Sequence, residues 1–220
     1  MKIAIDGPAG AGKSTIARAA AEKLGFVYID TGAMYRAVAL SCVRRGIDTK
    51  SDAEAVIKTL PEIAVGIRHE NGMQRIFLGS EDVSEAIRRP EISVAASDVA
   101  VIPEVRLKLV ELQRNLSEQQ NVIMDGRDIG TYVLPDAEVK IFLTADVEER
   151  AKRRYRELCE KGTETTLEAV LEDMKYRDAN DSGRSFAPLR KAEDAVLLDN
   201  TNLSPEASVQ KVISLIRGEA

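Results

Sequence analysis

The chain has 220 residues, of which 44% are hydrophobic, and it carries a formal net charge of −5. This length suits one α/β domain with a smaller insertion, and the negative charge argues against a protein that coats nucleic acid, although 31 lysines and arginines can still gather in a site. Strand residues begin almost at Met1, and no apolar run approaches the roughly 20 residues that span a membrane, so we expect a cytoplasmic protein with no membrane anchor. Cys42 and Cys159 fit no metal spacing, and we expect both to be reduced thiols.

The first predicted strand, Lys2–Asp6, leads into a phosphate-binding pattern. The pattern G-x-x-x-x-G-K-[ST] is met at every fixed position by Gly7-Pro8-Ala9-Gly10-Ala11-Gly12-Lys13-Ser14, which we call the phosphate loop. An alanine-rich helix is predicted from Thr15 to Leu24. Glycines that open a helix direct main-chain N–H groups at one point, where they can hold a phosphate. The sequence therefore predicts a nucleoside triphosphate site, with a glycine turn that merely joins strand and helix as the alternative.

The middle of the chain changes its pattern. A strand is predicted at Phe26–Ile29, a helix from Gly32 to Arg45, and a second helix from a capping box at Ser51–Glu54 to Pro61. Two short strands follow, at Ile63–Arg68 and Arg75–Leu78, and the Asn71-Gly72 pair between them is a hairpin signal. Residues of about 60–85 are thus expected to form an antiparallel insertion.

The remaining elements return to alternating helices and strands, which indicates a parallel sheet covered on both faces. Pro90 and Pro103 lie near the starts of two helices. The later elements are strands at Asn121–Asp125, Val139–Leu143 and Ala195–Leu198, and helices from Asp146 to near Gly162, from a capping box at Thr165–Glu168, and from Ser204 and Pro205 onward.

Two segments follow strand ends, where open α/β sheets bind ligands. In Asp30–Arg36, Thr31 can donate its hydroxyl and Arg36 can clamp a phosphate; the alternative is a helix cap followed by a surface arginine. In Asp125–Asp128, Asp125 can hold Mg²⁺ through water; the alternative is a turn with a local Arg–Asp pair.

Two further segments carry arginines on predicted helices. The first contains Arg150, Lys152, Arg153, Arg154 and Arg156, mostly expected to be solvated, with Arg153 as the candidate that closes over a transferring phosphoryl group. In the second, Arg177 and Asp181 are four residues apart and share a helix face, which fits either a ligand site or a surface ion pair.

Together these segments resemble the bacterial cytidylate kinases of the nucleoside monophosphate kinase superfamily, over almost the whole chain. The phosphate loop alone would indicate only a superfamily, whereas two later segments are far more specific. The resemblance rests on Ile5-Asp6-Gly7-Pro8, Asp30-Thr31-Gly32-Ala33-Met34-Tyr35-Arg36, Asp125-Gly126-Arg127-Asp128-Ile129-Gly130-Thr131, Phe142-Leu143-Thr144-Ala145 and the segment from Arg177 to Arg184.

The resemblance implies roles for the matching residues. It assigns the phosphate of CMP to Arg36, Arg127 and Arg184, and the cytosine ring to Ser97, Arg106 and Asp128. It assigns the sugar hydroxyls to Arg177 and Asp181, and the ATP phosphates to Gly7, Pro8, Ala9, Gly10, Ala11, Gly12, Lys13, Ser14 and Thr15. Catalysis would then rest on Lys13, Arg127 and Arg153, with Mg²⁺ held at Ser14 and Asp125.

The implied activity is transfer of the γ-phosphoryl group of ATP to CMP or dCMP, by a monomer that uses Mg²⁺ and binds no nucleic acid. The expected fold is α/β, a P-loop kinase domain over residues 1–220 with a parallel sheet of about five strands flanked by helices. Its core would be 1–30, 86–145 and 185–220, its monophosphate-binding region with the β insertion about 31–85, and its lid about 146–184. The alternatives are a kinase for UMP or another small acceptor, and a nucleotide-dependent switch, although no Asn-Lys-x-Asp motif occurs.

Overall fold

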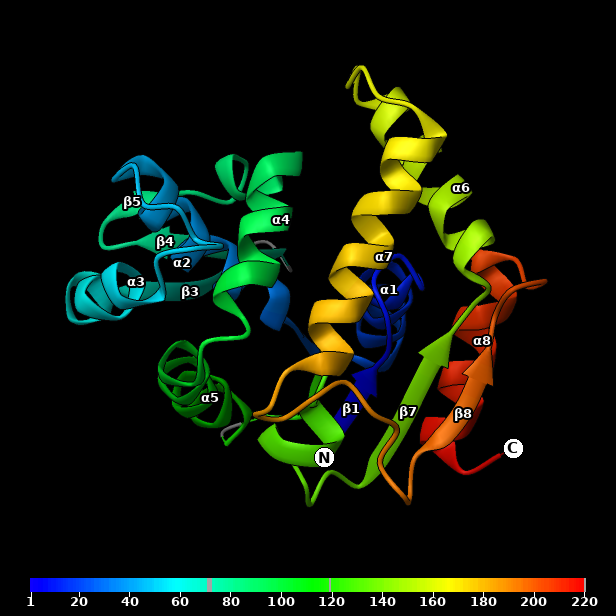
Figure 1. Ribbon diagram of the computed structural model, residues 1–220. Coiled ribbons are helices and arrows are strands. Elements are labelled where there is room, and N and C mark those ends of the chain that lie inside the picture. Colours follow the sequence, from blue (N-terminus) through cyan, green and yellow to red (C-terminus); the bar gives the residue numbers. More distant parts are fainter. Residues whose placement is uncertain (71–72, 119, 220) are drawn as a thin grey trace. The chain divides into compact units, whose positions relative to one another are not determined.

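A five-stranded sheet carries the phosphate loop at the end of its central strand. The structure is a computed structural model that describes residues 1–70, 73–118 and 120–219. The strand order is β2-β6-β1-β7-β8, and β1 pairs in parallel with β6 and β7 while β7 pairs in parallel with β8. Figure 1 shows β1, β7 and β8 of this sheet. The strands are β2 (Val27–Asp30), β6 (Val122–Gly126), β1 (Lys2–Asp6), β7 (Val139–Thr144) and β8 (Val196–Asp199). The predicted fold class is confirmed.

Contacts divide the chain into two compact units. The first consists of Met1–Tyr28 and Gln120–Ala220, and the second is Ile29–Gln119. The sequence predicts residues 86–119 as part of the core, whereas the contacts group them with the insertion. The functional boundaries of core, monophosphate-binding region and lid stay predictions.

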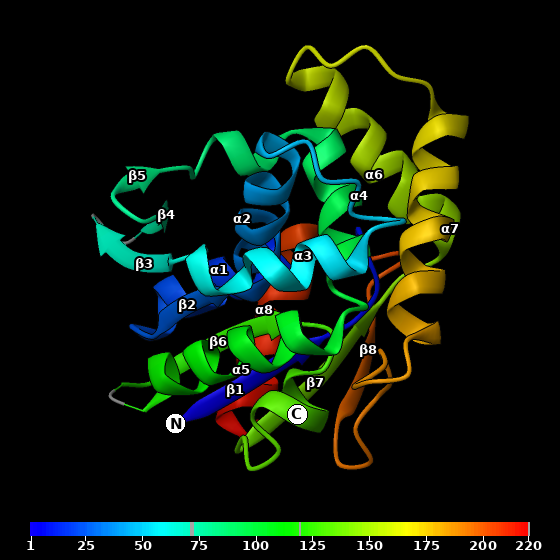
Figure 2. The ribbon, with the colours of Figure 1, turned by 60° about the vertical axis from the view of Figure 1, so that its left-hand side comes forward.

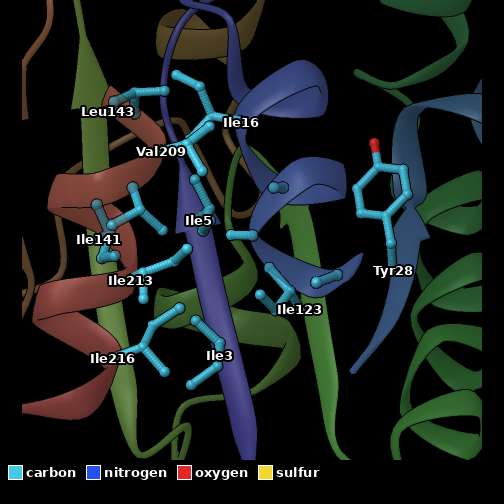
Figure 3. Packing of buried hydrophobic residues seen from close by; sticks show 14 of the residues in the cluster. Ile3, Ile5, Ile16, Tyr28, Ile123, Ile141, Leu143, Val209, Ile213 and Ile216 are labelled. Carbon is cyan, nitrogen blue, oxygen red and sulfur yellow. The ribbon is translucent and has the colours of Figure 1, made fainter. Parts of the chain in front are cut away.

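The apolar core of the first unit lies between the sheet and two helices, α1 (Lys13–Leu24) and α8 (Pro205–Arg217). Figure 3 shows Ile3 and Ile5 of β1 beside Ile213 of α8, and both strand isoleucines are fully buried. Burial of one such side chain contributes roughly 1.5–3 kcal/mol to folding. The strand that ends at the phosphate loop is therefore firmly anchored in this unit.

Two further helices and a turn complete the first unit. Helices α6 (Val147–Glu160) and α7 (Leu167–Gly183) pack on each other through a small apolar cluster that includes Leu158 and Met174. A single π-helical turn, η3 (Ile129–Val133), follows β6 and was not predicted from the sequence. Turns of this kind are frequent at functional sites.

The second unit combines helices with a small antiparallel sheet, β3-β4-β5 (Figure 2). The predicted insertion is confirmed, and the two-residue strand β5 is an addition to it. The helices and short turns are α2 (Thr31–Arg44), α3 (Ala53–Thr59), η1 (Leu60–Glu62), η2 (Ala86–Arg88), α4 (Pro90–Val99) and α5 (Pro103–Ser117), and the strands are β3 (Val65–Glu70), β4 (Met73–Leu78) and β5 (Glu81–Asp82). The predicted turn residues 71–72 lie outside the described residues.

Helix starts show where the local signals were right and where they were wrong. Ser204 caps α8 by accepting from the N–H of Ala207, and Pro90 and Pro103 each occupy a first helical position. The capping residue of α3 is Asp52, not Ser51, and that of α7 is Thr166, not Thr165. In both wrong cases the neighbouring residue also has an oxygen that can accept from the first turn, so the box pattern alone could not choose between them.

Pro61 does not stop α3 directly, because the chain continues from Thr59 into η1, which contains the proline. Cys42 is buried and Cys159 is exposed, and both are free thiols. None of the helices in the described ranges is both long and apolar enough to cross a membrane.

Candidate nucleotide-binding site

The phosphate loop turns tightly against its own unit. Gly7 has a φ of 150°, and a Cβ at this position would overlap the carbonyl oxygen of Leu143 on β7. Gly10 has a φ of 70°, and a Cβ there would overlap the end of the Met174 side chain. Gly12 is the left-handed N-cap of α1. Only glycine gives a main chain this conformation and this close an approach without strain.

Lys13 is buried inside this loop. Its Nζ donates to the carbonyl oxygen of Pro8 at 2.7 Å, and only 6% of the residue is exposed. Burial, together with the positive charge of Arg127, lowers the pKa of Lys13 to about 7, although Asp125 and Asp181 oppose the change. A phosphate group bound in the loop would stabilise the ammonium form, so the lysine is poised to gain charge when an anion arrives.

Ser14 and Asp125 form an oxygen pair beside the loop. The Ser14 hydroxyl donates to Asp125 Oδ2 at 2.8 Å, and the Tyr28 hydroxyl donates to Asp125 Oδ1 at 3.1 Å. Parallel pairing of β1 with β6 sets Asp125 opposite Ile5, just before the loop. One hydroxyl and one carboxylate are ligands that Mg²⁺ accepts, because the ion keeps several waters and takes other oxygens from substrate phosphates.

Asp6 links the start of the loop to the turn after β6. Its two carboxylate oxygens accept the N–H groups of Ile129 and Gly130, each at 2.8 Å. Burial raises the pKa of Asp6 to about 6, although these two N–H groups favour the ionised form. No role was predicted for Asp6 from the sequence, although a carboxylate directly before a phosphate loop was an available signal.

Two arginines and two carboxylates form a chain of ion pairs between the end of β6 and the end of α7. Arg127 Nε donates to Asp181 Oδ2 at 2.6 Å, and Arg184 lies 3.6 Å from the other oxygen of Asp181. Arg184 also donates to Asp128 Oδ1 at 3.3 Å. Burial alone would raise the pKa of Asp181, but Arg127 and Arg184 outweigh it, and the pKa is lowered overall. We call Arg127, Asp128, Asp181 and Arg184 the charge chain.

The charge chain adds to one reading of the sequence and corrects another. The sequence placed Arg177 beside Asp181, one helical turn away, and the structure adds Arg127, which is 54 residues away. The charge of Arg177 also helps to lower the Asp181 pKa. The local alternative for Arg127, a pair confined to its own turn, is wrong, because its Nε is bound to Asp181.

Helices α6 and α7 contact the loop through Arg150 and Asp178. Arg150 donates to the carbonyl oxygen of Ala9 at 2.7 Å and to Asp178 Oδ2 at 2.8 Å. Asp178 Oδ1 in turn accepts from the N–H of Ala9 at 3.2 Å. The sequence grouped Arg150 with its charged neighbours but did not distinguish it; its burial is the property that sets it apart.

Arg153 contacts the loop that follows β8. Its guanidinium donates to the carbonyl oxygens of Asn200 and Thr201 at 2.9 and 3.0 Å, and it is paired with Glu149. Asn200 in turn donates its side-chain N–H to the carbonyl oxygen of Ala11 at 3.0 Å. In this structure Arg153 therefore supports the loop after β8, and its partner Asn200 contacts the phosphate loop.

The second unit holds the other predicted ligands. Asp30 caps α2 through the N–H of Ala33 and pairs with Arg36 at 2.9 Å. Arg36 Nε is buried and has no hydrogen-bond partner among the described residues. Thr31 is the buried first residue of α2, beside Asp30. This end of α2 thus presents an arginine donor that a bound anion can satisfy.

Ser97 and Arg106 lie on α4 and α5 of the same unit. Both residues are buried, Arg106 to 1% exposure. Arg106 donates to the carbonyl oxygen of Ala100 at 3.3 Å, and its guanidinium lies 5.4 Å from the centre of the Tyr35 ring. A buried arginine is costly unless it is bonded, which suits a residue that recognises a polar ligand.

Comparisons with known proteins agree along the whole chain. The cytidylate kinase family model matches residues 3–218. A protein of Caldicellulosiruptor saccharolyticus named cytidylate kinase is 54% identical over 215 residues, covering 98% of this chain and 95% of the relative. One of Clostridioides difficile with the same name is 51% identical over 216 residues, covering 98% of both chains.

Among solved structures, an uncharacterized protein from Eubacterium ventriosum is similar with a TM-score of 0.53 and 13% identity, over 99% of this chain and 98% of the other. At this identity the likeness shows the fold alone. The family match and the relatives are independent of it, and they show that the chain belongs to the cytidylate kinase family.

Proposed function

We propose a role for each residue of the candidate site in the reaction of this chain. The chain is a nucleoside monophosphate kinase that transfers the γ-phosphoryl group of ATP to CMP or dCMP. The observation that carries the activity is the family match over residues 3–218, together with a phosphate loop complete at every fixed position. The assignments below extend this activity to single residues.

The donor side is assigned to the phosphate loop. Main-chain N–H groups from Gly7 to Thr15 hold the ATP phosphates, and Lys13 binds the β- and γ-phosphates. Ser14 and Asp125 hold Mg²⁺, since their oxygens already meet at 2.8 Å. Mg²⁺, when bound, supplies positive charge to the phosphates of ATP.

The acceptor side is assigned to the two sets of arginines and polar residues. Arg127 and Arg184 of the charge chain and Arg36 of the second unit bind the phosphate of CMP, and Thr31 donates its hydroxyl. The cytosine ring is assigned to Asp128, Ser97 and Arg106, and the sugar hydroxyls to Arg177 and Asp181. The chemistry supports this, because a carboxylate accepts from the cytosine amino group while arginine and serine donate to ring acceptors.

The transfer itself needs no covalent intermediate with the protein. An oxygen of the CMP phosphate attacks the γ-phosphorus, the bond from that phosphorus to the bridging oxygen breaks, and ADP leaves with the electron pair. Catalysis is then mainly positioning and stabilisation of charge. Lys13 and Arg127 supply that charge, with Arg153 as the proposed arginine from α6.

A coupled assay of ADP release, run with each nucleoside monophosphate in turn, tests the substrate assignment. CMP and dCMP should be much better acceptors than UMP, AMP or GMP, because the O4 of uracil accepts where cytosine donates. Asp128→Asn should reduce the ratio of kcat/KM for CMP to that for UMP by about tenfold, which is the value of one charged hydrogen bond. An unchanged ratio would remove Asp128 from recognition of the base.

A further inference from the structure

One polar side chain of the antiparallel insertion faces the interior of its unit. Gln74 lies on β4 two residues before Ile76, which is 2% exposed. Side chains alternate along a strand, so Gln74 and Ile76 point to the same face. An amide in such a position destabilises the fold unless its groups are bonded, so its contacts indicate why it is there.

Both polar groups of Gln74 bind the main chain of one residue, Asp30. The N–H of Asp30 donates to Gln74 Oε1 at 2.9 Å, and Gln74 Nε2 donates to the carbonyl oxygen of Asp30 at 3.1 Å. This is the pair of bonds that a neighbouring strand would supply. The side chain of Gln74 therefore fixes the main chain of Asp30 where β2 ends and α2 begins.

The carboxylate of Asp30 acts on the first turns of α2. Its Oδ1 accepts from the N–H of Ala33, and its Oδ2 accepts from Arg36 Nη2, each at 2.9 Å. A Cβ at Gly32 would lie 3.2 Å from Asp30 Oδ1 and 3.3 Å from Arg36 Nη1, so there is little free space between these groups. The position of the guanidinium is therefore sensitive to any shift of Asp30.

We propose that Gln74 is a positioning residue for acceptor binding, which fixes Asp30 so that Asp30 holds the Arg36 guanidinium ready for the acceptor phosphate. The inference rests on the proposed role of Arg36 as a ligand of that phosphate. It gives the antiparallel insertion a task in the reaction. The route runs from a strand of the insertion through one main chain and one carboxylate to a single arginine, and all of it lies within the second unit.

The first test is Gln74→Met, which keeps the length of the side chain and removes both polar groups. We expect the KM for CMP to rise about five- to tenfold, the range that the loss of one or two hydrogen bonds gives. The KM for ATP should stay within about twofold, and kcat should change little. Met73→Leu, on the same strand and largely exposed, is the control that should change nothing.

A purely structural role would lower the melting temperature and leave both KM values alone, and this result would overturn the proposal. If Gln74→Met fails to fold, Gln74→Glu replaces it. Glutamate keeps an acceptor for the N–H of Asp30, but its second oxygen has no proton to donate to the Asp30 carbonyl oxygen, so the KM for CMP should again rise.

A double-mutant cycle separates this proposal from the function on which it rests. Arg36→Met alone should raise the KM for CMP by about a hundredfold, as expected for loss of a charged contact. Gln74→Met should add almost nothing in the Arg36→Met background, because the group that it positions is gone. A full Gln74 effect in that background would overturn the positioning role alone, whereas an unchanged KM in Arg36→Met would reject the role of Arg36 itself.

Discussion

The phosphate loop and the charge chain lie in the same unit, and the anion sites that we propose in them are built in different ways. The loop offers main-chain groups at a helix start, and its side chains are small except for Lys13. The charge chain consists of charged side chains, in which Asp181 pairs with Arg127 and Arg184 while Asp128 also pairs with Arg184. One site is made by the path of the backbone, and the other by neutralising buried charges against each other.

The phosphate loop and the charge chain should therefore respond differently to substitution. Main-chain N–H groups survive most side-chain substitutions, so only the glycines, Lys13 and the proposed Mg²⁺ ligand Ser14 are critical in the loop. In the charge chain every residue is the partner of another, so removal of one takes a partner from a buried charge. We therefore expect Lys13 variants to lose activity without losing the fold, and charge-chain variants to lose both.

Lys13→Ala should give the largest effect. We expect kcat to fall by about a thousandfold or more, because a charge stabiliser of the transferring phosphoryl group is removed. The melting temperature should not fall, since burial already disfavours the charged form and lowers the Lys13 pKa to about 7. Steady-state kinetics and thermal unfolding check both parts, with Lys23→Ala on the same helix as the control. A variant with substantial remaining turnover would contradict the assignment.

Asp181→Ala should affect activity and stability together. We expect a loss of about 3–5 kcal/mol in the free energy of unfolding, because Arg127 and Arg184 lose a buried partner. kcat/KM should fall for CMP and dCMP alike, with an additional loss for CMP if Asp181 binds the 2′-hydroxyl. Asp173→Ala, exposed on the same helix, is the control.

The pH dependence of this stability has a fixed sign. Since the pKa of Asp181 is lowered in the folded state, its contribution is present above the ordinary aspartate pKa and is lost as pH falls through the lowered value. Unchanged unfolding free energy in Asp181→Ala would show that the charge chain does not stabilise the fold.

Asp6 should show the opposite sign. Its pKa is raised from 3.8 to about 6 in the folded state, so the folded protein binds the extra proton first and this residue's contribution to stability increases as pH falls from 7 to 4. The shift corresponds to about 2–3 kcal/mol. Urea unfolding of wild type and Asp6→Asn at several pH values, without nucleotide, isolates this term, and Asp136→Asn at an exposed position is the control. A difference that does not vary with pH would contradict the raised pKa.

The smallest effect is expected for the exposed pair of Lys58 and Glu54, one turn apart on α3 at 2.7 Å. Lys58→Ala should change the unfolding free energy by at most about 0.5 kcal/mol, because solvent screens such pairs. Kinetic constants should not change. A large loss of unfolding free energy here would mean that an ion pair stabilises the fold through its geometry without burial. Burial would then not distinguish the charge chain from a surface pair.

What the sequence could predict follows the same division. Strand–loop–helix order, the glycine pattern and the parallel sheet are local or periodic signals, and the structure agrees with them. The pairing of Asp181 with Arg127 and that of Asp30 with Gln74 could not be predicted from the sequence, because the partners come from distant segments. Spacing along a helix pointed to Arg177 because a neighbour one turn away is visible in sequence, whereas a partner brought in by another strand is not.

Gln74 and Arg150 illustrate a second limit. The sequence predicted the strand that contains Gln74 and the basic helix that contains Arg150. It did not show that these two residues, and not their neighbours, turn their polar groups inward. A polar residue at an inward position of an alternating strand was a usable signal for Gln74. For Arg150 the sequence offers five basic residues within one helix, and only packing decides which of them reaches the main chain of Ala9.

The crowding at Gly7 and Gly10 has a consequence for laboratory evolution of this chain. At Gly7 the obstacle is the main-chain carbonyl of Leu143, which no second substitution can remove. At Gly10 it is the flexible tip of Met174. A randomised library should therefore return glycine alone at position 7, while an alanine at position 10 can be partly tolerated when a suppressor shortens Met174, with only the strain of the left-handed backbone remaining.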